Sequence, residues 1–411
     1  MSEANPVSPG TMTTRPRFGL RSFLLRQFSR HADSWLTSGR LTIESPWTAP
    51  IQVSAANPGP AGHIRINRAR ALRRVSKGGS LGLADSYIDG DWDSDDLTGT
   101  LELGIRNIDA LSGMTRARAS IRWLARMRQK AQANSLTGSR RNIMAHYDLG
   151  KEFYATWLDP EMVYSAAIFK SPDEPLTRAQ LRKFDHLARY LDLQPRDRLL
   201  EIGCGWGGFA IHAARNYGAS VTALTISPAQ AERARERVAA AGLEGQVEIR
   251  LQDYRKTEGE FDKIASIEMF EAVGEKYWPV FFGTVHDRLR PGGKAAMQII
   301  TIDDDRFENY RRNPDFIQMR VFPGGMLPGP SLFRHHAAAA GLETTRSIDF
   351  GGDYARTLQR WRQAFTRAWP DIQGWGFDER FRRLWTYYLS YCEAGFRGGH
   401  ISVSQHAMVR R

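Results

Sequence analysis

Short apolar runs alternate with amphipathic segments through the C-terminal two thirds of the chain. Apolar runs bounded by turn residues lie at 198–202, 220–225, 247–251, 261–267 and 294–300. Segments with the apolar spacing of helices lie between them, at 208–217, 228–241 and 277–289. Because strand, helix and strand follow one another with short connections, the pattern predicts a doubly wound α/β domain with a mostly parallel sheet.

A smaller region precedes this domain. Strand-like alternation at 41–44 and 63–66 is followed by a glycine-rich segment that runs to Trp92. This pattern predicts a modest N-terminal α+β domain. We expect a disordered tail rich in Ser, Pro, Thr and Gly, this N-terminal domain, a basic helical linker and the large domain, at 1–14, 15–109, 110–141 and 142–411 respectively.

The positive charge is concentrated in the N-terminal third. The chain of 411 residues has a formal net charge of +12, and residues 1–141 contain 21 Lys and Arg against 11 Asp and Glu. Residues 110–141 carry no acidic side chain. Such a field attracts nucleic acid or anionic lipid headgroups, whereas a merely solvated linker helix is the plainer alternative.

Neither a membrane span nor a metal or disulfide framework is indicated. No run approaches the roughly 18 apolar residues that a span needs. Arg21 and Arg26 interrupt the apolar positions of 15–30, which favours a basic amphipathic helix lying on a membrane surface over a signal peptide. The two cysteines, Cys204 and Cys392, are far apart and lie in no CxxC pattern. We therefore expect no metal and a reducing, cytoplasmic setting.

A glycine-rich turn follows the first strand of the large domain, in the segment EIGCGWGG (201–208). The pattern GxGxxG alone is weak evidence for a dinucleotide site, because such a site also needs an acidic residue at the end of the second strand. That strand ends in ALTIS (223–227), without an acid. Acidic residues stand instead at Glu201, at Asp253 after the third strand, and at Glu268 and Glu271 after the fourth. This arrangement resembles S-adenosylmethionine-dependent methyltransferases, in which an acid after the third strand reaches the adenine amino group.

Further motifs narrow the resemblance. They are GSLGLADSY (79–87), HYDLG (146–150), LDPEMVYS (158–165), IGCGWGG (202–208), LTIS (224–227), LQDYR (251–255), MFEAVG (269–274), FPGGMLP (322–328) and WTYYL (385–389). In this order they resemble the cyclopropane-fatty-acyl-phospholipid synthase family from about residue 78 to the C-terminus. The resemblance implies a seven-stranded methyltransferase sheet, an N-terminal lipid-associated domain and a homodimer.

The same resemblance implies the reaction. Members of that family transfer a methyl group from S-adenosylmethionine to the cis double bond of an unsaturated acyl chain in a membrane phospholipid, through a carbocation, and form a cyclopropane. It implies that the cofactor is surrounded by Tyr164, Ser165, Gly203, Gly205, Thr225, Gln230, Asp253 and Tyr254. We therefore expect a cytoplasmic enzyme peripherally associated with an anionic membrane, with no nucleic-acid partner, since the chain lacks the Pro-Pro signature of amino-methyltransferases.

The carbocation requires a dry site with electron-rich faces, which aromatic rings supply through cation–π attraction. Candidates at family-like positions are Tyr164, Phe270, Tyr310, Tyr354 and Tyr387. For each of them, a role as an ordinary core aromatic is an alternative of at least equal weight.

The base that removes the last proton is the point where this chain departs from the family. There, a bound bicarbonate is held by Cys, Glu, His and Tyr side chains and by backbone groups. Here Glu271 and Tyr354 are present, but Ala166 and Gln298 stand at the cysteine and histidine positions. Bicarbonate is therefore in doubt.

Glu268 is an addition, since better-known members of the family have glycine at this position. We take Glu271, Tyr354, Glu268 and Gln298 as the catalytic candidates. One hypothesis is that Glu268 or Glu271 replaces bicarbonate as the base, because two carboxylates in a dry pocket raise each other's pKa. The alternative is that Glu268 pairs with an arginine while Glu271 holds an ion or a water molecule.

A changed base leaves the product open. Loss of a proton from the new methyl group gives a cyclopropane, whereas loss from a neighbouring chain carbon gives a methyl-branched unsaturated acyl chain. A lipid-binding protein that keeps the cofactor fold without catalysing the reaction is a further alternative.

Overall fold

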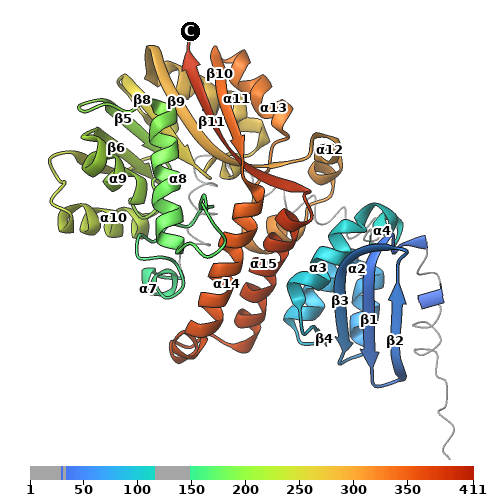
Figure 1. Cartoon of the computed structure of the whole chain (residues 1–411). Helices are drawn as coiled ribbons and strands as arrows, with labels where there is room; N and C mark the ends of the chain where they lie inside the picture. Colours follow the sequence, from blue (N-terminus) through green and yellow to red (C-terminus); the bar gives the residue numbers. More distant parts are fainter. Residues whose placement is uncertain (1–28, 31–33, 116–148) are drawn as a thin grey trace, which may run out of the picture.

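The computed structural model describes residues 29–30, 34–115 and 149–411. The predicted tail, most of the amphipathic segment at 15–30 and the linker from residue 116 onward lie outside these residues. Figure 1 shows two sheets, each with its own helices.

The N-terminal sheet has four strands in the order β2-β1-β3-β4. Their bounds are Ser38–Ser45 (β1), Thr48–Ser54 (β2), Asn57–Ile66 (β3) and Trp92–Asp93 (β4). The helices that accompany the sheet are Arg70–Ile88 (α2), Leu97–Arg106 (α3) and Ile108–Thr115 (α4). Strand β1 pairs antiparallel with β2 and parallel with β3, and the predicted strand segments lie inside β1 and β3. Helix α3 lies between this sheet and the large domain, and α4 lies at the upper end of the sheet (Figure 1).

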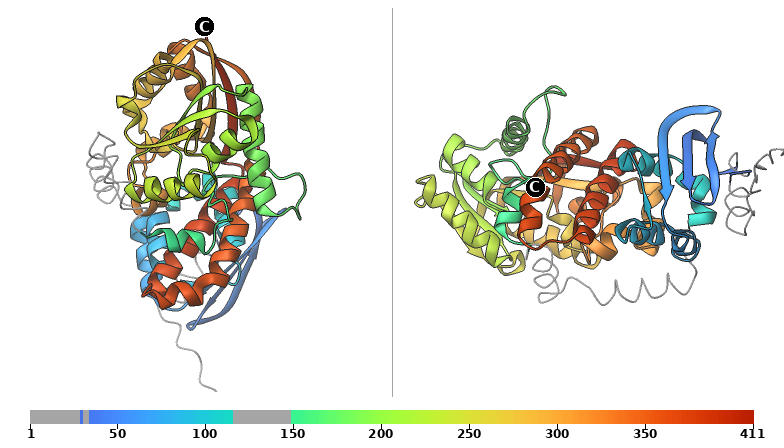
Figure 2. Two further views of the ribbon diagram at one scale, coloured as in Figure 1. Left: turned by 90° about the vertical axis from the view of Figure 1, so that its left-hand side faces the viewer. Right: turned by 90° about the horizontal axis from the view of Figure 1, so that it is seen from below.

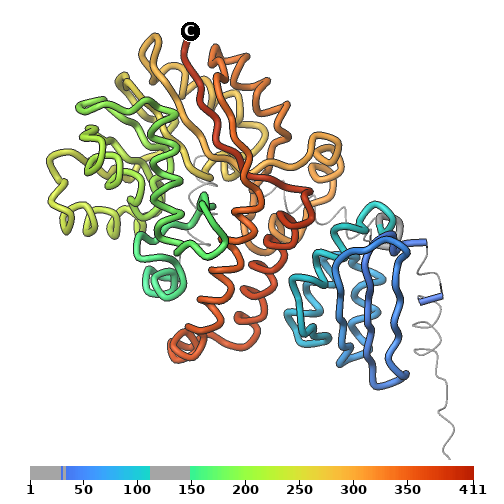
Figure 3. Tube along the Cα trace, in the orientation of Figure 1, coloured from blue at the N-terminus to red at the C-terminus, as the bar shows by residue number. Residues whose placement is uncertain are grey.

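The large sheet has seven strands in the order β10-β11-β9-β8-β5-β6-β7. Their bounds are Arg198–Ile202 (β5), Ser220–Thr225 (β6), Val247–Leu251 (β7), Phe261–Ile267 (β8), Leu289–Ile302 (β9), Leu342–Asp349 (β10) and Ile401–Arg410 (β11). Strands β5 to β9 run parallel, and β11 pairs antiparallel with both β9 and β10. The predicted mostly parallel sheet is confirmed. Figure 3 traces the chain to its C-terminal end on β11, which lies inside the sheet.

Helices cover both faces of the large sheet. The helices of this domain are Lys151–Ala155 (α7), Leu176–Leu191 (α8), Gly208–Tyr217 (α9), Pro228–Ala240 (α10), Trp278–Arg288 (α11), Asp304–Arg312 (α12), Pro330–Ala339 (α13), Gly351–Gly374 (α14) and Glu379–Arg397 (α15). Short helical turns lie at Tyr254–Lys256 (η2), Phe270–Ala272 (η3), Glu275–Tyr277 (η4) and Ile317–Val321 (η5). One core contains Leu187, Phe209 and Val238 of α8, α9 and α10, and a second contains Phe282 and Phe333 of α11 and α13. The domain is therefore doubly wound, as expected.

Helices α14 and α15 connect the two parts of the molecule. They lie between the large sheet and the N-terminal helices in two views (Figures 1 and 2). An apolar stripe on α14 is buried in the aromatic core, at Leu358, Trp361, Phe365 and Trp369. Ion pairs also cross between the parts, including Arg320 with Asp85 at 2.8 Å. Among the described residues, no helix combines the length and the apolarity that crossing a membrane requires.

Candidate active site

The glycine turn begins where β5 ends. Gly203 and Gly205 have φ angles of +85° and +51°, a region that favours glycine. The backbone N–H of Gly203 donates to the carbonyl of Leu224 at 3.0 Å, which fixes the turn to β6. A Cβ on Gly205 would meet no atom within 4 Å. The turn therefore leaves open space above the start of α9, as a bound ligand requires.

This space belongs to a cavity of about 1450 Å³. It is lined by all eight residues expected to surround the cofactor: Tyr164, Ser165, Gly203, Gly205, Thr225, Gln230, Asp253 and Tyr254. Glu268, Glu271 and Tyr354 line the same cavity. The fold thus brings the cofactor candidates and three of the four catalytic candidates together.

Two polar residues of α8 support the cofactor side of this cavity, and sequence reasoning missed both. Lys183 donates from Nζ to Ser165 Oγ at 2.7 Å, and Gln180 donates from Nε2 to the Ser165 carbonyl at 2.9 Å. Burial lowers the pKa of Lys183 to about 8, although the nearby carboxylates of Glu268, Asp159 and Glu201 raise it. The sequence did contain a signal for these two residues, because Gln180 and Lys183 are a polar pair three residues apart on the apolar face of a helix.

Asp253 and Glu201 differ in their surroundings. Arg255 engages both carboxylate oxygens of Asp253, from Nε at 2.8 Å and from its terminal nitrogen at 2.6 Å. Glu201 is fully buried, and its Oε2 has no hydrogen-bond partner in the described part of the chain. Burial raises the pKa of Glu201 to about 8, against the lowering effect of Lys183. The proposed contact of Asp253 with adenine stays a prediction.

Glu268 comes directly after β8 and is clamped by three donors. Its Oε1 accepts from the backbone N–H of Ala166 and from Gln298 Nε2, both at 2.7 Å. Its Oε2 accepts from the Tyr354 hydroxyl at 2.7 Å. In the described part of the chain, Glu268 has no arginine partner, contrary to the alternative considered above. Burial raises the pKa of Glu268, and the three donors and Lys183 oppose that rise.

Glu271 lies one turn further, on η3, and its carboxylate accepts from backbone N–H groups. Its Oε1 accepts from the backbone N–H of Ile300 at 2.5 Å. Its Oε2 is buried and has no hydrogen-bond partner among the described residues. Burial, followed by the charge of Glu268, raises the pKa of Glu271 to about 8.

Gln298 takes a different place from the one expected of a catalytic residue. It is fully buried on β9 and does not line the cavity. Besides Glu268, its Nε2 donates to the Ala166 carbonyl at 3.1 Å, and its Oε1 accepts from Gln405 at 3.0 Å. Gln298 therefore positions Glu268 from behind, which corrects its assignment to the group of residues that face substrate.

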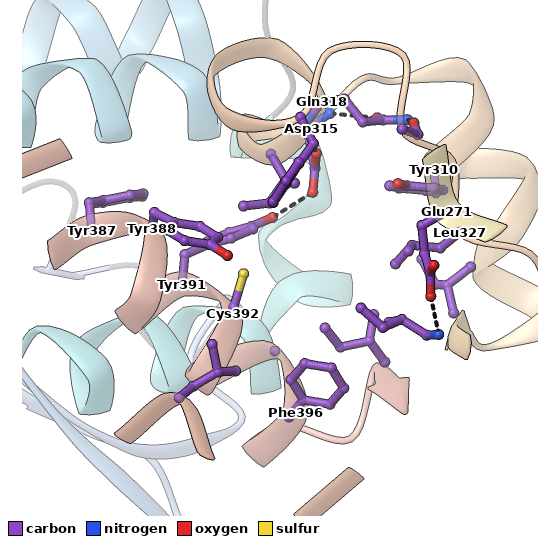
Figure 4. A pocket seen from close by; sticks show the side chains of 18 of the residues that line it. Glu271, Tyr310, Asp315, Gln318, Leu327, Tyr387, Tyr388, Tyr391, Cys392 and Phe396 are labelled. Carbon is purple, nitrogen blue, oxygen red and sulfur yellow. Dashed lines mark hydrogen bonds between the residues drawn. The ribbon is translucent and has the colours of Figure 1, made fainter. Parts of the chain in front are cut away.

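Aromatic side chains make up much of the remaining wall. Tyr388 and Tyr391 of α15 face Glu271 and Tyr310 across the cavity (Figure 4). The Tyr388 and Tyr164 hydroxyls are 2.7 Å apart. Of the five aromatic candidates, Tyr164, Tyr310, Tyr354 and Tyr387 line the cavity.

Phe270, the fifth candidate, does not line it. Its ring packs against Trp278 at 5.5 Å and Phe281 at 5.2 Å between ring centroids, in the core under α11. The assignment of Phe270 to the cation-stabilising wall is therefore wrong, and the alternative of an ordinary core aromatic holds for this residue.

A family model described as mycolic acid cyclopropane synthetase matches residues 134–406. The chain belongs to this family. A tuberculostearic acid methyltransferase of Mycobacterium tuberculosis is 37% identical over 387 residues, covering 91% of this chain and 89% of that relative. A cyclopropane-fatty-acyl-phospholipid synthase of Escherichia coli K12 is 34% identical over 395 residues, covering 95% and 97%.

Solved structures of family members agree. A cyclopropane synthase from Mycobacterium tuberculosis has a TM-score of 0.62 at 30% identity, covering 66% of this chain and 98% of its own. A mycolic acid cyclopropane synthase complexed with SAH and CTAB has a TM-score of 0.61 at 31% identity, with the same coverage. This member of the cyclopropane synthetase family is therefore an S-adenosylmethionine-dependent methyltransferase, as the motifs indicated.

Bicarbonate does not fit this family member in the same way. Three groups at the positions that the resemblance gives to the anion could hold it: the Ala166 N–H, the Tyr354 hydroxyl and the Gln298 amide. All three donate to the Glu268 carboxylate. A separate bicarbonate would have to displace that carboxylate and leave it buried without donors, which is costly.

The two glutamates behave as a coupled pair. Both are partly buried where they line the cavity, and the charge of Glu268 raises the pKa of Glu271. Donors from three other residues favour the charge on Glu268, whereas Glu271 has the backbone N–H groups of Ile300 and of Glu271 itself. The surroundings therefore favour charge on Glu268 over charge on Glu271, whose pKa is raised to about 8.

A stability measurement tests this assignment. The pKa of Glu271 rises from 4.5 to about 8 on folding, so the folded chain keeps a proton that the unfolded chain loses in this interval. From this group alone, the free energy of unfolding should fall with rising pH by up to about 1.4 kcal/mol per unit. The Glu271→Gln variant should lose this pH dependence. Its free energy of unfolding, measured by urea denaturation, should therefore rise relative to that of the wild type between pH 5 and pH 8. A difference that is independent of pH would contradict the raised pKa.

Proposed function

We propose that this protein transfers a methyl group from S-adenosylmethionine to the cis double bond of an unsaturated acyl chain in a phospholipid, with Glu268 as the base. The observation that carries this proposal is the Glu268 carboxylate, which lies on the cavity wall under three donors, among tyrosine rings.

The side chains of the cavity suit each requirement of the reaction. When bound, S-adenosylmethionine would supply an electrophilic methyl group, with the electrons of the broken S–CH₃ bond left on the sulfur of S-adenosylhomocysteine. The π electrons of the alkene form the new carbon–carbon bond, and positive charge is left on the neighbouring chain carbon. Tyr164, Tyr310 and Tyr388 line the cavity and present electron-rich rings to this cation. The mainly apolar wall keeps out water, which would otherwise trap the cation.

Glu268 then accepts a proton, and its carboxylate becomes a carboxylic acid. If the proton leaves the new methyl group, the electrons of that C–H bond close a cyclopropane. We favour this product because the carboxylate occupies the point where the side chains at 298 and 354 and the backbone at 166 converge. Those are the positions that the family resemblance gives to bicarbonate.

A methyl-branched unsaturated chain is the second candidate. The base is covalently fixed to the turn after β8, so its reach differs from that of a free ion. One relative that covers 91% of the chain is named as a methyltransferase rather than as a synthase. Removal of a proton from a chain carbon next to the cation would give this product without any change in the earlier steps.

Deuterium retention distinguishes the two products. The protein is incubated with S-adenosylmethionine that carries a CD₃ group and with vesicles of cis-unsaturated phospholipid, and the fatty acid methyl esters are analysed by mass spectrometry. A cyclopropane keeps two deuterium atoms and resists mild hydrogenation, whereas the branched product keeps three and takes up hydrogen. Lipid without deuterium would overturn the enzymatic proposal and favour a lipid-binding role.

The membrane is the proposed location of the substrate. The excess of basic residues in 1–141 supports docking on anionic headgroups. Turnover should therefore rise when anionic phospholipid is added to neutral vesicles, and salt should weaken this effect. The homodimer stays a prediction.

A further inference from the structure

The cavity continues beyond the catalytic side chains into the N-terminal domain. There it is lined by apolar residues of β1, β3, α2 and α3: Leu41, Ile43, Ile66, Val75, Leu101 and Ile105. We call this part, between the small sheet and its helices, the N-terminal chamber. Its wall is continuous with the wall around Glu268, so two domains enclose one space.

Polar side chains line the cavity where its two parts meet. Arg306 and Asn309 of α12 and His400, which follows α15, belong to this junction. Arg306 also donates to Asp109 of α4 at 2.8 Å, an ion pair that joins the two domains. A polar region thus lies between the apolar chamber and the site of methyl transfer.

The volume of the cavity exceeds the needs of the cofactor and one chain. Pockets for single small ligands have volumes of about 300–1000 Å³. A methylene group takes up about the volume of a water molecule, about 30 Å³, so an eighteen-carbon chain needs roughly 540 Å³. The cavity of about 1450 Å³ therefore has room beside the cofactor for more than the reacting chain.

We propose that the N-terminal chamber holds the second, non-reacting acyl chain of the same phospholipid. This inference rests on the proposed function and adds that the preferred substrate has two chains. The two chains of a diacyl lipid are attached to adjacent glycerol carbons. With the headgroup bound at the polar junction, one chain can extend toward Glu268 and the other into the chamber. Burial of the second chain in apolar surroundings favours binding of the whole lipid.

Gly104 offers a clean way to fill the chamber. It lies on α3 and lines the cavity, and a Cβ there would meet no atom within 4 Å. A side chain at this helical position also removes the entropic penalty of glycine. Gly283 on α11 is the matched control, because it too has open space around its Cβ but does not line the cavity.

The experiment compares Gly104→Phe and Gly283→Phe with the wild type on two substrates in the same mixed micelles. One is a phosphatidylglycerol with a cis-unsaturated and a saturated chain, and the other is the lysolipid with the unsaturated chain alone. We expect Gly104→Phe to lower kcat/KM for the diacyl lipid by tenfold or more and to change it less than twofold for the lysolipid. Gly283→Phe should leave both unchanged.

Other outcomes overturn the proposal. Equal losses on both substrates would mean that the substitution disturbs binding of the reacting chain or destabilises the fold. No loss on either substrate would mean that no lipid chain occupies the chamber. Thermal unfolding and S-adenosylmethionine binding of each variant separate misfolding from a filled chamber. Failure of the wild type to methylate either lipid would instead count against the proposed function.

Discussion

Replacing Glu268 by Gln should lower kcat by a factor of about 10²–10⁴, the range typical for loss of a general base. The amide keeps the size of the side chain but cannot accept the proton from the methylated chain. S-adenosylmethionine binding should stay within a few-fold of the wild type, because Gln is nearly isosteric and the cofactor residues are untouched. The measurement is single-turnover transfer of labelled methyl to lipid, together with calorimetric binding of the cofactor.

Glu271→Gln is the matched comparison. Below pH 8 the Glu271 carboxyl is mainly protonated, so an amide resembles its resting state and turnover at pH 7 should fall by less than about tenfold. An active Glu268→Gln variant beside an inactive Glu271→Gln variant would reverse the two roles. Equal, complete losses would show that the pair acts as one unit.

Replacing Gly205 by Val should weaken S-adenosylmethionine binding by roughly 100-fold, since overpacking costs about 1–3 kcal/mol and each 1.4 kcal/mol is a factor of ten in affinity. Nothing in the protein lies within 4 Å of a Cβ at this position, which lines the cavity at the glycine turn. The added side chain would occupy the space left for the cofactor. Calorimetric titration with S-adenosylmethionine measures the effect directly.

A control variant separates the effect of backbone strain on cofactor binding from the effect of contact between the new side chain and the cofactor. Gly242 has a φ of +67° and also has open space around its Cβ, but it does not line the cavity. Gly242→Val should therefore lose similar stability, about 1–2 kcal/mol from the left-handed backbone, and bind the cofactor normally. If both variants bind weakly, strain in the fold and not contact with the cofactor explains the result.

The central strands could be predicted from local pattern alone. β5, β6, β7 and β8 begin and end at the expected residues, because each is a short buried run bounded by turn residues. The pairing of β10 and β11 was not predictable in this way. β11 enters the sheet after two long helices, and its place beside β9 depends on packing between segments about a hundred residues apart.

The residues of the candidate site likewise fall into those that the sequence predicts and those that it does not. The glycine turn, Asp253 and both glutamates could be found because their chemistry lies in short motifs. The clamp on Glu268 could not, since its donors come from segments far apart in sequence that meet only in the folded chain. The support of Ser165 by Lys183 likewise depends on how α8 packs against the loop before it.

Glu268 has a φ of +47°, in the region where a side chain costs about 1–2 kcal/mol relative to glycine. Bicarbonate, the acceptor that the family resemblance implies, would come from dissolved carbonate and therefore from the CO₂ that the surroundings supply. A carboxylate carried on the chain makes the acceptor as abundant as the enzyme itself. On the proposed mechanism, the strained backbone frees lipid methylation from the gas exchange of its environment.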